Sequence, residues 1–292
     1  RRLPPAWISV TGSNLQSYNA TATSKLDYWD RAISPTDLTT LLDSSVPPPV
    51  AQRRVVLATP RSYSLDGLRR AQKPVGLHGR ELTVESHIVV SEAPPLENLA
   101  HAARQAGLEV RGFILEPLAS GEAVLTSTER EMGVVLVDIG GGTSDIAVFQ
   151  QGTIMYTAAI PVGGYQFTND LCLALNVTYP TAEALKLQHG HAIPEKIEDT
   201  HSIEFPGTVP GSIQKVRQRE LCTFISQRAW ELVRLVLYHI QKAGLTRVPA
   251  GGIVVTGGTS KLPGLVDLFR DMSSAPVRAG TPKDNLSLPE DL

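Results

Sequence analysis

The stretch from Val134 to Val148 constrains the fold more than any other part of the sequence. It reads VVLVDIGGGTSDIAV, an apolar run, a carboxylate, three consecutive glycines and a second apolar run. Short runs rich in β-branched residues are typical of buried strands. Glycines adopt the positive φ angles that a tight turn requires. The stretch therefore predicts two strands joined by a glycine turn, with Asp138 where the turn begins.

The composition of this turn indicates its chemistry. Because they lack side chains, Gly140, Gly141 and Gly142 let backbone N–H groups approach an anion such as a phosphate, and Thr143 follows them. A carboxylate beside a phosphate is useful when hydrated Mg²⁺ lies between the two, which makes Asp138 the candidate metal residue. The alternative is a hairpin that only turns a corner, since glycine motifs alone are weakly specific.

Composition restricts the class of protein. The 292 residues are enough for two or more domains with real cores, and a net charge of −2 with 42% hydrophobic and 19% charged residues is ordinary for a globular chain. This charge predicts no basic face for nucleic acid, and no apolar run is long enough to span a membrane. Cys172 and Cys222 lack metal-ligand spacing, so we expect both thiols to be buried in a reducing cytoplasm.

The first part of the chain, residues 1–92, predicts a small α/β unit. Ser34–Pro35 suits the start of a helix, because serine caps a helix and proline fits its first turn. Leu82 to Val90 alternates in the manner of a half-buried strand, and His87 is expected on its exposed side. Glu116 is expected at the end of a later strand, where ligands bind in α/β sheets; a solvated carboxylate before a proline is the alternative.

A second glycine turn, Thr256–Ser260, follows another predicted strand. We expect a helix from Leu262 to Met272 directly after it, so that Gly257, Gly258 and Thr259 lie at a helix N-terminus suited to a nucleotide.

Two helices are predicted between the glycine turns, the first from Ala182 to His189 with Thr181 as its cap. Glu183 and Lys186 then lie three residues apart on one side, and the alternative for them is a weak surface ion pair. The second helix is the longest of the chain, roughly 214–243, and its apolar residues step by three and four.

With both glycine motifs and the helical segment between them, the sequence resembles the superfamily of actin, sugar kinases and Hsp70, and within it the FtsA family of bacterial cell-division proteins. The stretches that carry the resemblance are ISVTGSNLQSYN, PVGLHGRELTVESHIVV, LENLAHAARQAGLEV, LEPLASGEAVL, GVVLVDIGGGTSDIAVFQQGTIMYTAAIPVGGYQFTNDL, TAEALKLQHG and GGIVVTGGTSKLPGL. They cover nearly the whole chain. PilM and MreB are the nearest competing relatives, and a small-molecule kinase of the superfamily is a further alternative.

The resemblance implies an α/β fold of the actin-like ATPase type, with RNase H-like domains and an inserted small α/β subdomain. It implies an inserted interaction subdomain at 1–92, the rest of the first domain at 93–130, a second domain at 131–170 with 251–292, and a further subdomain at 171–250. It also implies that the chain begins after the first phosphate loop of the family and lacks the C-terminal membrane helix. We therefore expect a fragment that binds ATP poorly by itself.

Residue roles follow from the same resemblance. Gly140, Gly141, Gly142 and Thr143 match the motif that wraps the β- and γ-phosphates of ATP, and Asp138 matches the carboxylate that holds hydrated Mg²⁺. Glu183 and Lys186 match the helix that contacts ribose and adenine. Gly257, Gly258 and Thr259 match the adenosine motif. Glu116 matches the residue that positions the attacking water, a task of orientation in phosphoryl transfer.

The resemblance further implies a function at the division site, on the cytoplasmic face of the cell membrane. It implies an ATP-binding protein that tethers the FtsZ ring to the membrane through residues 171–250, self-associates into filaments and recruits later division proteins through residues 1–92. Hydrolysis is expected to be slow or absent, so the resemblance leaves open whether the chain is an enzyme. A nucleotide-free scaffold is the remaining alternative.

Overall fold

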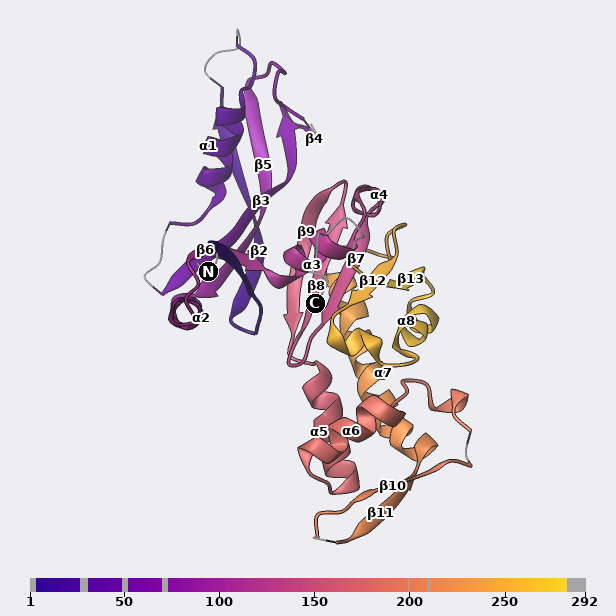
Figure 1. Cartoon of the computed structure of the whole chain (residues 1–292). Helices are drawn as coiled ribbons and strands as arrows, with labels where there is room; N and C mark the ends of the chain where they lie inside the picture. The colour runs from indigo at the N-terminus through magenta and orange to yellow at the C-terminus, as the bar shows by residue number, and fades with distance from the viewer. Residues whose placement is uncertain are drawn as a thin grey trace.

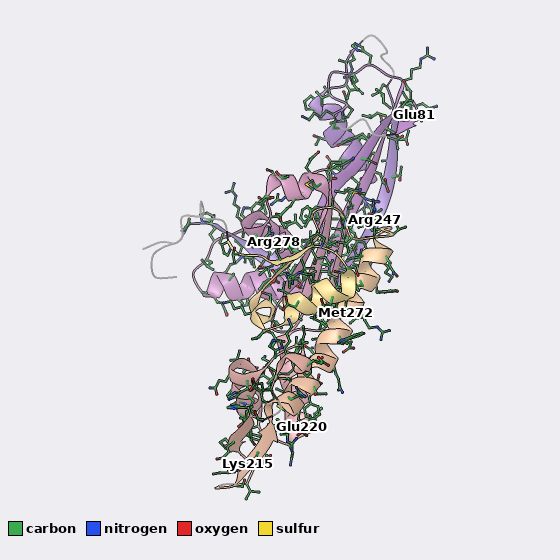
Figure 2. The ribbon with its side chains drawn as sticks, turned by 90° about the vertical axis from the view of Figure 1, so that its right-hand side faces the viewer. Glu81, Lys215, Glu220, Arg247, Met272 and Arg278 are labelled. Atoms are coloured by element: carbon green, nitrogen blue, oxygen red, sulfur yellow. The ribbon has the colours of Figure 1, made fainter. Side chains whose placement is uncertain are left out.

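The structure, a computed structural model, describes residues 4–26, 31–48, 52–69, 73–198, 200–209 and 211–282. It is elongated: a sheet of β2, β3, β4 and β5 lies at one end, a sheet of β7, β8, β9, β12 and β13 lies in the middle, and a helical region with α5 and α6 lies at the other end (Figure 1). Figure 2 shows Glu81 at one extremity and Lys215 at the other, with Met272 and Arg278 between them. No helix of these described residues is long and apolar enough to cross a membrane.

The front sheet is antiparallel, with the strand order β2-β5-β3-β4, and helix α1 covers one of its faces. Ser34 caps α1 as expected, because its side chain accepts from Asp37 N while Asp37 bonds back to Ser34 N. The bounds are β2 (Leu15–Lys25), α1 (Pro35–Ser45), β3 (Arg53–Leu65), β4 (Leu68–Arg69) and β5 (Glu81–Glu92).

The expectation for His87 is wrong, because this side chain is 1% exposed. β5 lies in the middle of the front sheet, and its second face meets strand β9 (Thr153–Ile160) of the next sheet. His87 Nδ1 lies 2.9 Å from Asn19 Oδ1 and its Nε2 lies 2.9 Å from Thr157 Oγ1. Ser17 Oγ donates to Thr157 O at 2.8 Å. These four residues form a contact that we call the β9 junction.

A two-stranded parallel sheet, β1-β6, lies beside the front sheet and shares a small core with it. Helix α2 begins at Ala93, so that its prolines occupy the first turn, where a missing N–H is tolerated. The four-segment division of the chain stays a prediction. The bounds in this region are β1 (Ala6–Val10), α2 (Ala93–Gln105), β6 (Val110–Leu115), α3 (Glu116–Val124) and α4 (Ser127–Met132).

The central sheet has the strand order β13-β12-β7-β8-β9, and it carries both glycine turns. Strands β7 and β8 are buried almost throughout, as the apolar runs predict. The main core lies between this sheet and the helices that follow it, and a smaller core with α3 lies on the opposite face. The bounds are β7 (Val134–Ile139), β8 (Ser144–Gln150), β12 (Ile253–Thr256) and β13 (Val277–Ala279).

The remaining elements form the helical region. Helix α7 begins at Gln218, four residues later than expected, because Ile213–Arg217 pairs with β10 as a strand. Its predicted stripe of apolar residues faces the core. Cys222 is buried there as expected, whereas Cys172 on α5 is only partly buried. The bounds are α5 (Gly164–Leu175), α6 (Tyr179–His189), η1 (Pro194–Lys196), β10 (Ser202–Pro206), β11 (Ile213–Arg217), α7 (Gln218–Lys242), η2 (Gly258–Lys261) and α8 (Leu265–Ser273).

Candidate nucleotide site

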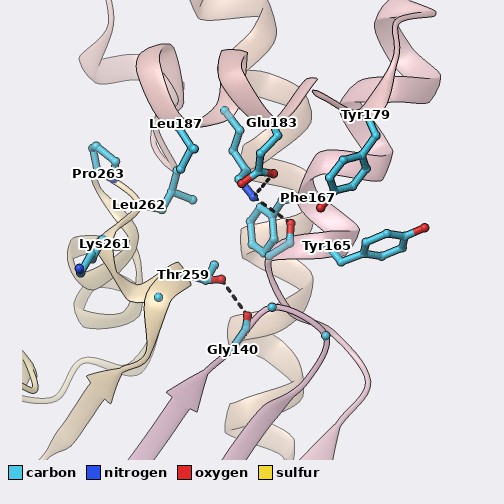
Figure 3. Close-up of a pocket in the computed structure, with 15 residues that line it drawn as sticks. Gly140, Tyr165, Phe167, Tyr179, Glu183, Leu187, Thr259, Lys261, Leu262 and Pro263 are labelled. Carbon is cyan, nitrogen blue, oxygen red and sulfur yellow. Dashed lines mark hydrogen bonds and ion pairs between the residues drawn. The ribbon is translucent and has the colours of Figure 1, made fainter. Parts of the chain in front are cut away.

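The two glycine turns meet at one edge of the central sheet. Strand β12 pairs in parallel with β7, and Thr256 lies opposite Asp138. The chain leaves both strands at the same level, so the second turn reaches the first. Thr259 Oγ1 donates to Gly140 O at 2.9 Å, which joins residues that are far apart in the sequence (Figure 3). The convergence of the two motifs is therefore a property of the strand pairing.

Close backbone approach explains two of the glycines. Gly257 has φ +87°, and a Cβ there would lie 2.4 Å from Asp138 Oδ1 and 2.5 Å from Ile139 O. A Cβ at Gly163 would lie 2.7 Å from Gly141 O. By contrast, a Cβ at Gly141 or Gly142 would meet nothing within 4 Å. Gly257 and Gly163 therefore exclude a side chain, whereas Gly141 and Gly142 face open space that a ligand can occupy.

The first turn of α5 fixes the glycine turn from the other side. Gly164 N donates to Gly140 O at 3.0 Å, and Tyr165 N donates to Gly141 O at 2.7 Å. These bonds engage the turn's carbonyl groups with a helix N-terminus. A helix N-terminus carries a partial positive charge, which favours an anion nearby.

A cavity of about 720 Å³ opens above this turn, within the range of small-molecule sites. Helix α6 supplies a charged pair, in which Lys186 Nζ lies 2.8 Å from Glu183 Oε2. The cavity is lined by Gly140, Gly141, Gly142, Gly164, Tyr165, Phe167, Tyr179, Glu183, Lys186, Leu187, Gly258, Thr259, Lys261, Leu262 and Pro263.

The Glu183–Lys186 pair is more than a solvated surface pair. The Lys186 side chain is 11% exposed, and its Nζ also donates to Thr168 Oγ1 at 2.8 Å and to Gly164 O at 3.1 Å. Burial alone would raise the pKa of Glu183, but hydrogen bonds from Lys186 and Thr168 hold it below its ordinary value. The Glu183 carboxyl is thus ionised at neutral pH, and its ion pair with Lys186 lines the cavity.

Two expectations about helix starts are wrong. Helix α6 begins at Tyr179 with Thr178 before it, so Thr181 lies inside the helix. The second glycine turn leads into a short 3-10 helix, η2, and α8 begins only at Leu265. Gly264 has φ +79°, which separates the two helices. The second turn therefore lies at the start of a 3-10 segment and not at an α-helix N-terminus.

Three carboxylates gather at the edge of the glycine turn, outside the cavity wall. Asp138 is 7% exposed and accepts a hydrogen bond from Ser120. Asp145 Oδ2 accepts from Thr11 Oγ1 at 2.5 Å and from Thr143 Oγ1 at 3.2 Å. Burial first, and then Asp145 and Asp138, raise the pKa of Glu116. Negative charge therefore accumulates here.

The carboxylate cluster fits a cation that phosphates help to hold. In the described part of the chain, no group of three or more His, Cys, Asp or Glu side chains is arranged to hold a metal ion by itself. Mg²⁺ commonly takes one or two protein carboxylates and completes its shell with water and phosphate oxygens. Asp138, whose charge helps to raise the pKa of both Glu116 and Asp145, suits that role.

The structure brings seven of the eleven predicted site residues into the cavity wall, namely Gly140, Gly141, Gly142, Glu183, Lys186, Gly258 and Thr259. The other four, Asp138, Thr143, Glu116 and Gly257, lie outside that wall. Sequence reasoning missed the apolar and aromatic lining, above all Tyr165 and Tyr179. The position of Tyr165 directly after Gly163–Gly164, a second glycine pair ending a strand, is a signal that could have identified it.

Solved structures share the fold. The chain superposes on MreB 5 of Spiroplasma citri bound to AMPPNP with a TM-score of 0.53 and 22% identity, covering 63% of this chain and 59% of that one. It superposes on the PilM–PilN type IV pilus biogenesis complex with a TM-score of 0.59 and 14% identity. This match covers 90% of this chain and 66% of that one. The fold is that of the actin-like ATPases, as the sequence predicts.

Sequence comparison identifies the family within that fold. The family described as "Cell division protein FtsA" matches residues 135–291, and the "SHS2 domain inserted in FTSA" matches residues 12–90. FtsA of Pseudomonas aeruginosa is 34% identical over 282 residues, which are 96% of this chain and 67% of that protein. FtsA of Bacillus subtilis is 30% identical over 283 residues, which are 96% of this chain and 64% of that protein. The chain belongs to the FtsA family of cell-division proteins and spans about two thirds of the length of these relatives.

Proposed function

We propose that this actin-like cell-division protein binds ATP in the cavity between the two glycine turns. The observation that carries the proposal is the convergence of Gly140–Gly142, the Glu183–Lys186 pair and Gly258–Thr259 on one cavity of about 720 Å³. Its glycine floor has open space in place of side chains, and the dipole of α5 adds a partial positive charge beside it. The S. citri MreB structure carries AMPPNP, which supports a nucleotide in this fold.

The chemistry of the walls assigns a part of ATP to each group. Gly140, Gly141, Gly142 and Thr143 would hold the phosphates. Glu183 and Lys186 would contact the ribose and the base, with Gly257, Gly258 and Thr259 on the other side. Asp138 would hold hydrated Mg²⁺, which neutralises phosphate charge when bound. Glu116 would orient a water molecule.

A thermal unfolding experiment tests nucleotide binding. ATP with Mg²⁺ at about 100 times its Kd stabilises a folded protein by about 2.7 kcal/mol, so the unfolding temperature should rise. Lys186→Met should remove most of this rise, because Lys186 is the nearly buried cation of the cavity. Lys215→Met on the exposed hairpin β10–β11 is the matched control and should keep it. An unfolding temperature that ATP leaves unchanged in the parent chain would contradict the proposal.

Gly141→Val examines the floor of the cavity. A Cβ at Gly141 meets nothing within 4 Å, so we expect the variant to fold normally. Its side chain would then occupy the space of the phosphates, and stabilisation by ATP should be lost. A variant that folds and still binds ATP as tightly as the parent would place the phosphates elsewhere.

We further propose that the protein links the FtsZ ring to the inner face of the membrane, self-associates into filaments and recruits later division proteins through its front subdomain. Membership of the FtsA family supports this role. The SHS2 match at 12–90 supports an interaction task for the front sheet, and the helical region offers a separate surface at the other extremity (Figure 2). Bound ATP would favour one arrangement of the front sheet relative to the helical region. Hydrolysis of the ATP would be slow.

Co-sedimentation tests the link to FtsZ. The chain should pellet with FtsZ polymers formed in GTP and stay in solution with unpolymerised FtsZ. Trp230→Ala removes a ring that is 50% exposed on α7, within residues 171–250, and should reduce pelleting. Tyr18→Ala removes a ring that is 38% exposed on the front sheet and should not. Equal recovery in the supernatant with and without polymers would contradict the FtsZ role.

A further inference from the structure

Two tyrosine rings form one wall of the cavity. Tyr165 and Tyr179 stack with ring centroids 5.5 Å apart and an angle of 25° between the planes. They remain 53% and 41% exposed although they line a cavity. Figure 3 shows both on the side opposite Leu187 and Pro263. The cavity is therefore bounded by an aromatic wall and an apolar wall, with the charged pair of α6 between them.

Each ring is tied to an element that lines the cavity. Tyr165 N donates to Gly141 O at 2.7 Å, so its backbone is fixed to the glycine turn. Tyr179 is the first residue of α6, the helix that carries Glu183 and Lys186. The pair thus bridges the first turn of α5 and the start of α6. A ligand that contacts both rings therefore also lies against α5, which is bonded to the glycine turn, and against α6, which carries Glu183 and Lys186.

The chemistry of the aromatic wall selects a part of the ligand. The face of an aromatic ring carries partial negative charge and does not attract phosphate. Flat, uncharged rings and sugars stack on aromatic side chains irrespective of base identity. Anionic groups are instead served by the glycine floor, which lies against the first turn of α5. The wall therefore suits the nucleoside of a nucleotide and not its phosphates.

We propose that Tyr165 and Tyr179 cover the nucleoside of the bound nucleotide and set its affinity. This inference rests on the proposed nucleotide site and adds the groups that recognise the nucleoside. Removing either ring then weakens ligands that contain a nucleoside and leaves the binding of a bare polyphosphate unchanged. A ring without its hydroxyl keeps most of the effect, because the contact is made by the ring face.

The experiment measures the Kd of ATP and of inorganic tripolyphosphate, both with Mg²⁺, on the whole chain by calorimetry. Tyr165→Ala and Tyr179→Ala should each weaken ATP by about tenfold or more. Tripolyphosphate should bind within about twofold of the parent value. Tyr165→Phe should keep the affinity for ATP. Tyr238→Ala is the matched control, because that ring is 51% exposed on α7 and lies outside the cavity wall.

The outcomes separate this inference from the proposed site itself. Unchanged ATP affinity in both alanine variants would overturn the role of the rings and leave the site intact. An equal loss for ATP and tripolyphosphate would also overturn it, because the rings would then act by holding the glycine turn. A parent chain that binds neither ligand would overturn the nucleotide site. The unfolding midpoint of each unliganded variant verifies that it folds.

Discussion

The cavity and the β9 junction are built from different parts of the chain. At the cavity, backbone atoms make the decisive contacts, as when Gly164 N and Tyr165 N bond to the carbonyl groups of the glycine turn. At the junction, side chains make them, since His87 bonds to Asn19 and Thr157. Where two backbone segments approach so closely that a Cβ would clash, as at Gly163 and Gly257, the position requires glycine and leaves a visible trace in the sequence. A side-chain contact between distant residues leaves no such trace. We therefore expect the cavity to lose stability when a side chain replaces a glycine, and the β9 junction when the pH falls or His87 is substituted.

The largest effect is expected where a side chain enters a backbone contact. Gly257→Ala places a Cβ 2.4 Å from Asp138 Oδ1 on a residue with φ +87°. The strained conformation and the overpacking together should lower the free energy of unfolding by roughly 4 kcal/mol. Gly258→Ala is the control, because a Cβ there meets nothing within 4 Å. Urea denaturation of both variants measures the difference in the free energy of unfolding, and equal losses would show that close backbone approach is not what requires glycine at position 257.

The junction should instead respond to pH. Burial first, and the charge of Arg61, lower the pKa of His87 from 6.5 to about 4. The unfolded chain therefore binds more protons than the folded one between these values, and stability falls as pH drops from about 6.5 to about 4. The loss should be up to about 3 kcal/mol. Urea denaturation across this range measures it. His87→Leu should show a smaller loss, and an unchanged pH profile in that variant would contradict the assignment.

At neutral pH the same substitution tests the hydrogen bonds. His87→Leu leaves Thr157 Oγ1 and Asn19 Oδ1 without this partner in a buried contact, so the free energy of unfolding should fall by about 2 kcal/mol. Thr83→Val, on the same strand, removes only an exposed contact to Thr23 and should cost less than about 0.5 kcal/mol. Similar losses in the two variants would show that the hydrogen bonds of the β9 junction contribute little to the free energy of unfolding.

The smallest effect is expected in the carboxylate cluster. Burial and the charges of Asp145 and Asp138 raise the pKa of Glu116, so its ionised form is disfavoured in the folded chain. Glu116→Gln should therefore raise the free energy of unfolding at pH 7 by less than about 1 kcal/mol. At pH 3, where both folded and unfolded chains carry a protonated acid, the gain should vanish. A variant less stable than the parent at pH 7 would mean that the carboxylate has a stabilising partner.

Much of the central sheet could be predicted from local patterns. The apolar runs around the first glycine turn gave β7 and β8, and the Ser34–Pro35 pair gave the start of α1 with its capping bonds. Helix starts without a pair such as Ser34–Pro35 lack this local signal. Helix α6 starts at Tyr179, where no side chain caps it, and the residue that resembled a cap, Thr181, lies within its first turn.

Other features could not be predicted, because they depend on which elements pack together. The alternation in β5 indicated one buried face, whereas contact with β9 buries the other face at His87. The spacing of Glu183 and Lys186 was compatible with a surface ion pair, and only the packing of α6 against α5 made it part of a cavity. Tyr165 and Tyr179 stack, and only the packing of α5 beside α6 brings their rings together.

The sequence by itself determined where the chain must turn tightly, which strands are buried and to which family the protein is similar. These properties are local, because glycine, proline and apolar spacing restrict the backbone near themselves. The tertiary structure alone decided that β12 lies beside β7, that both glycine turns share one cavity and that His87 is buried. Those outcomes depend on contacts between distant residues, which the pattern of any one segment does not encode.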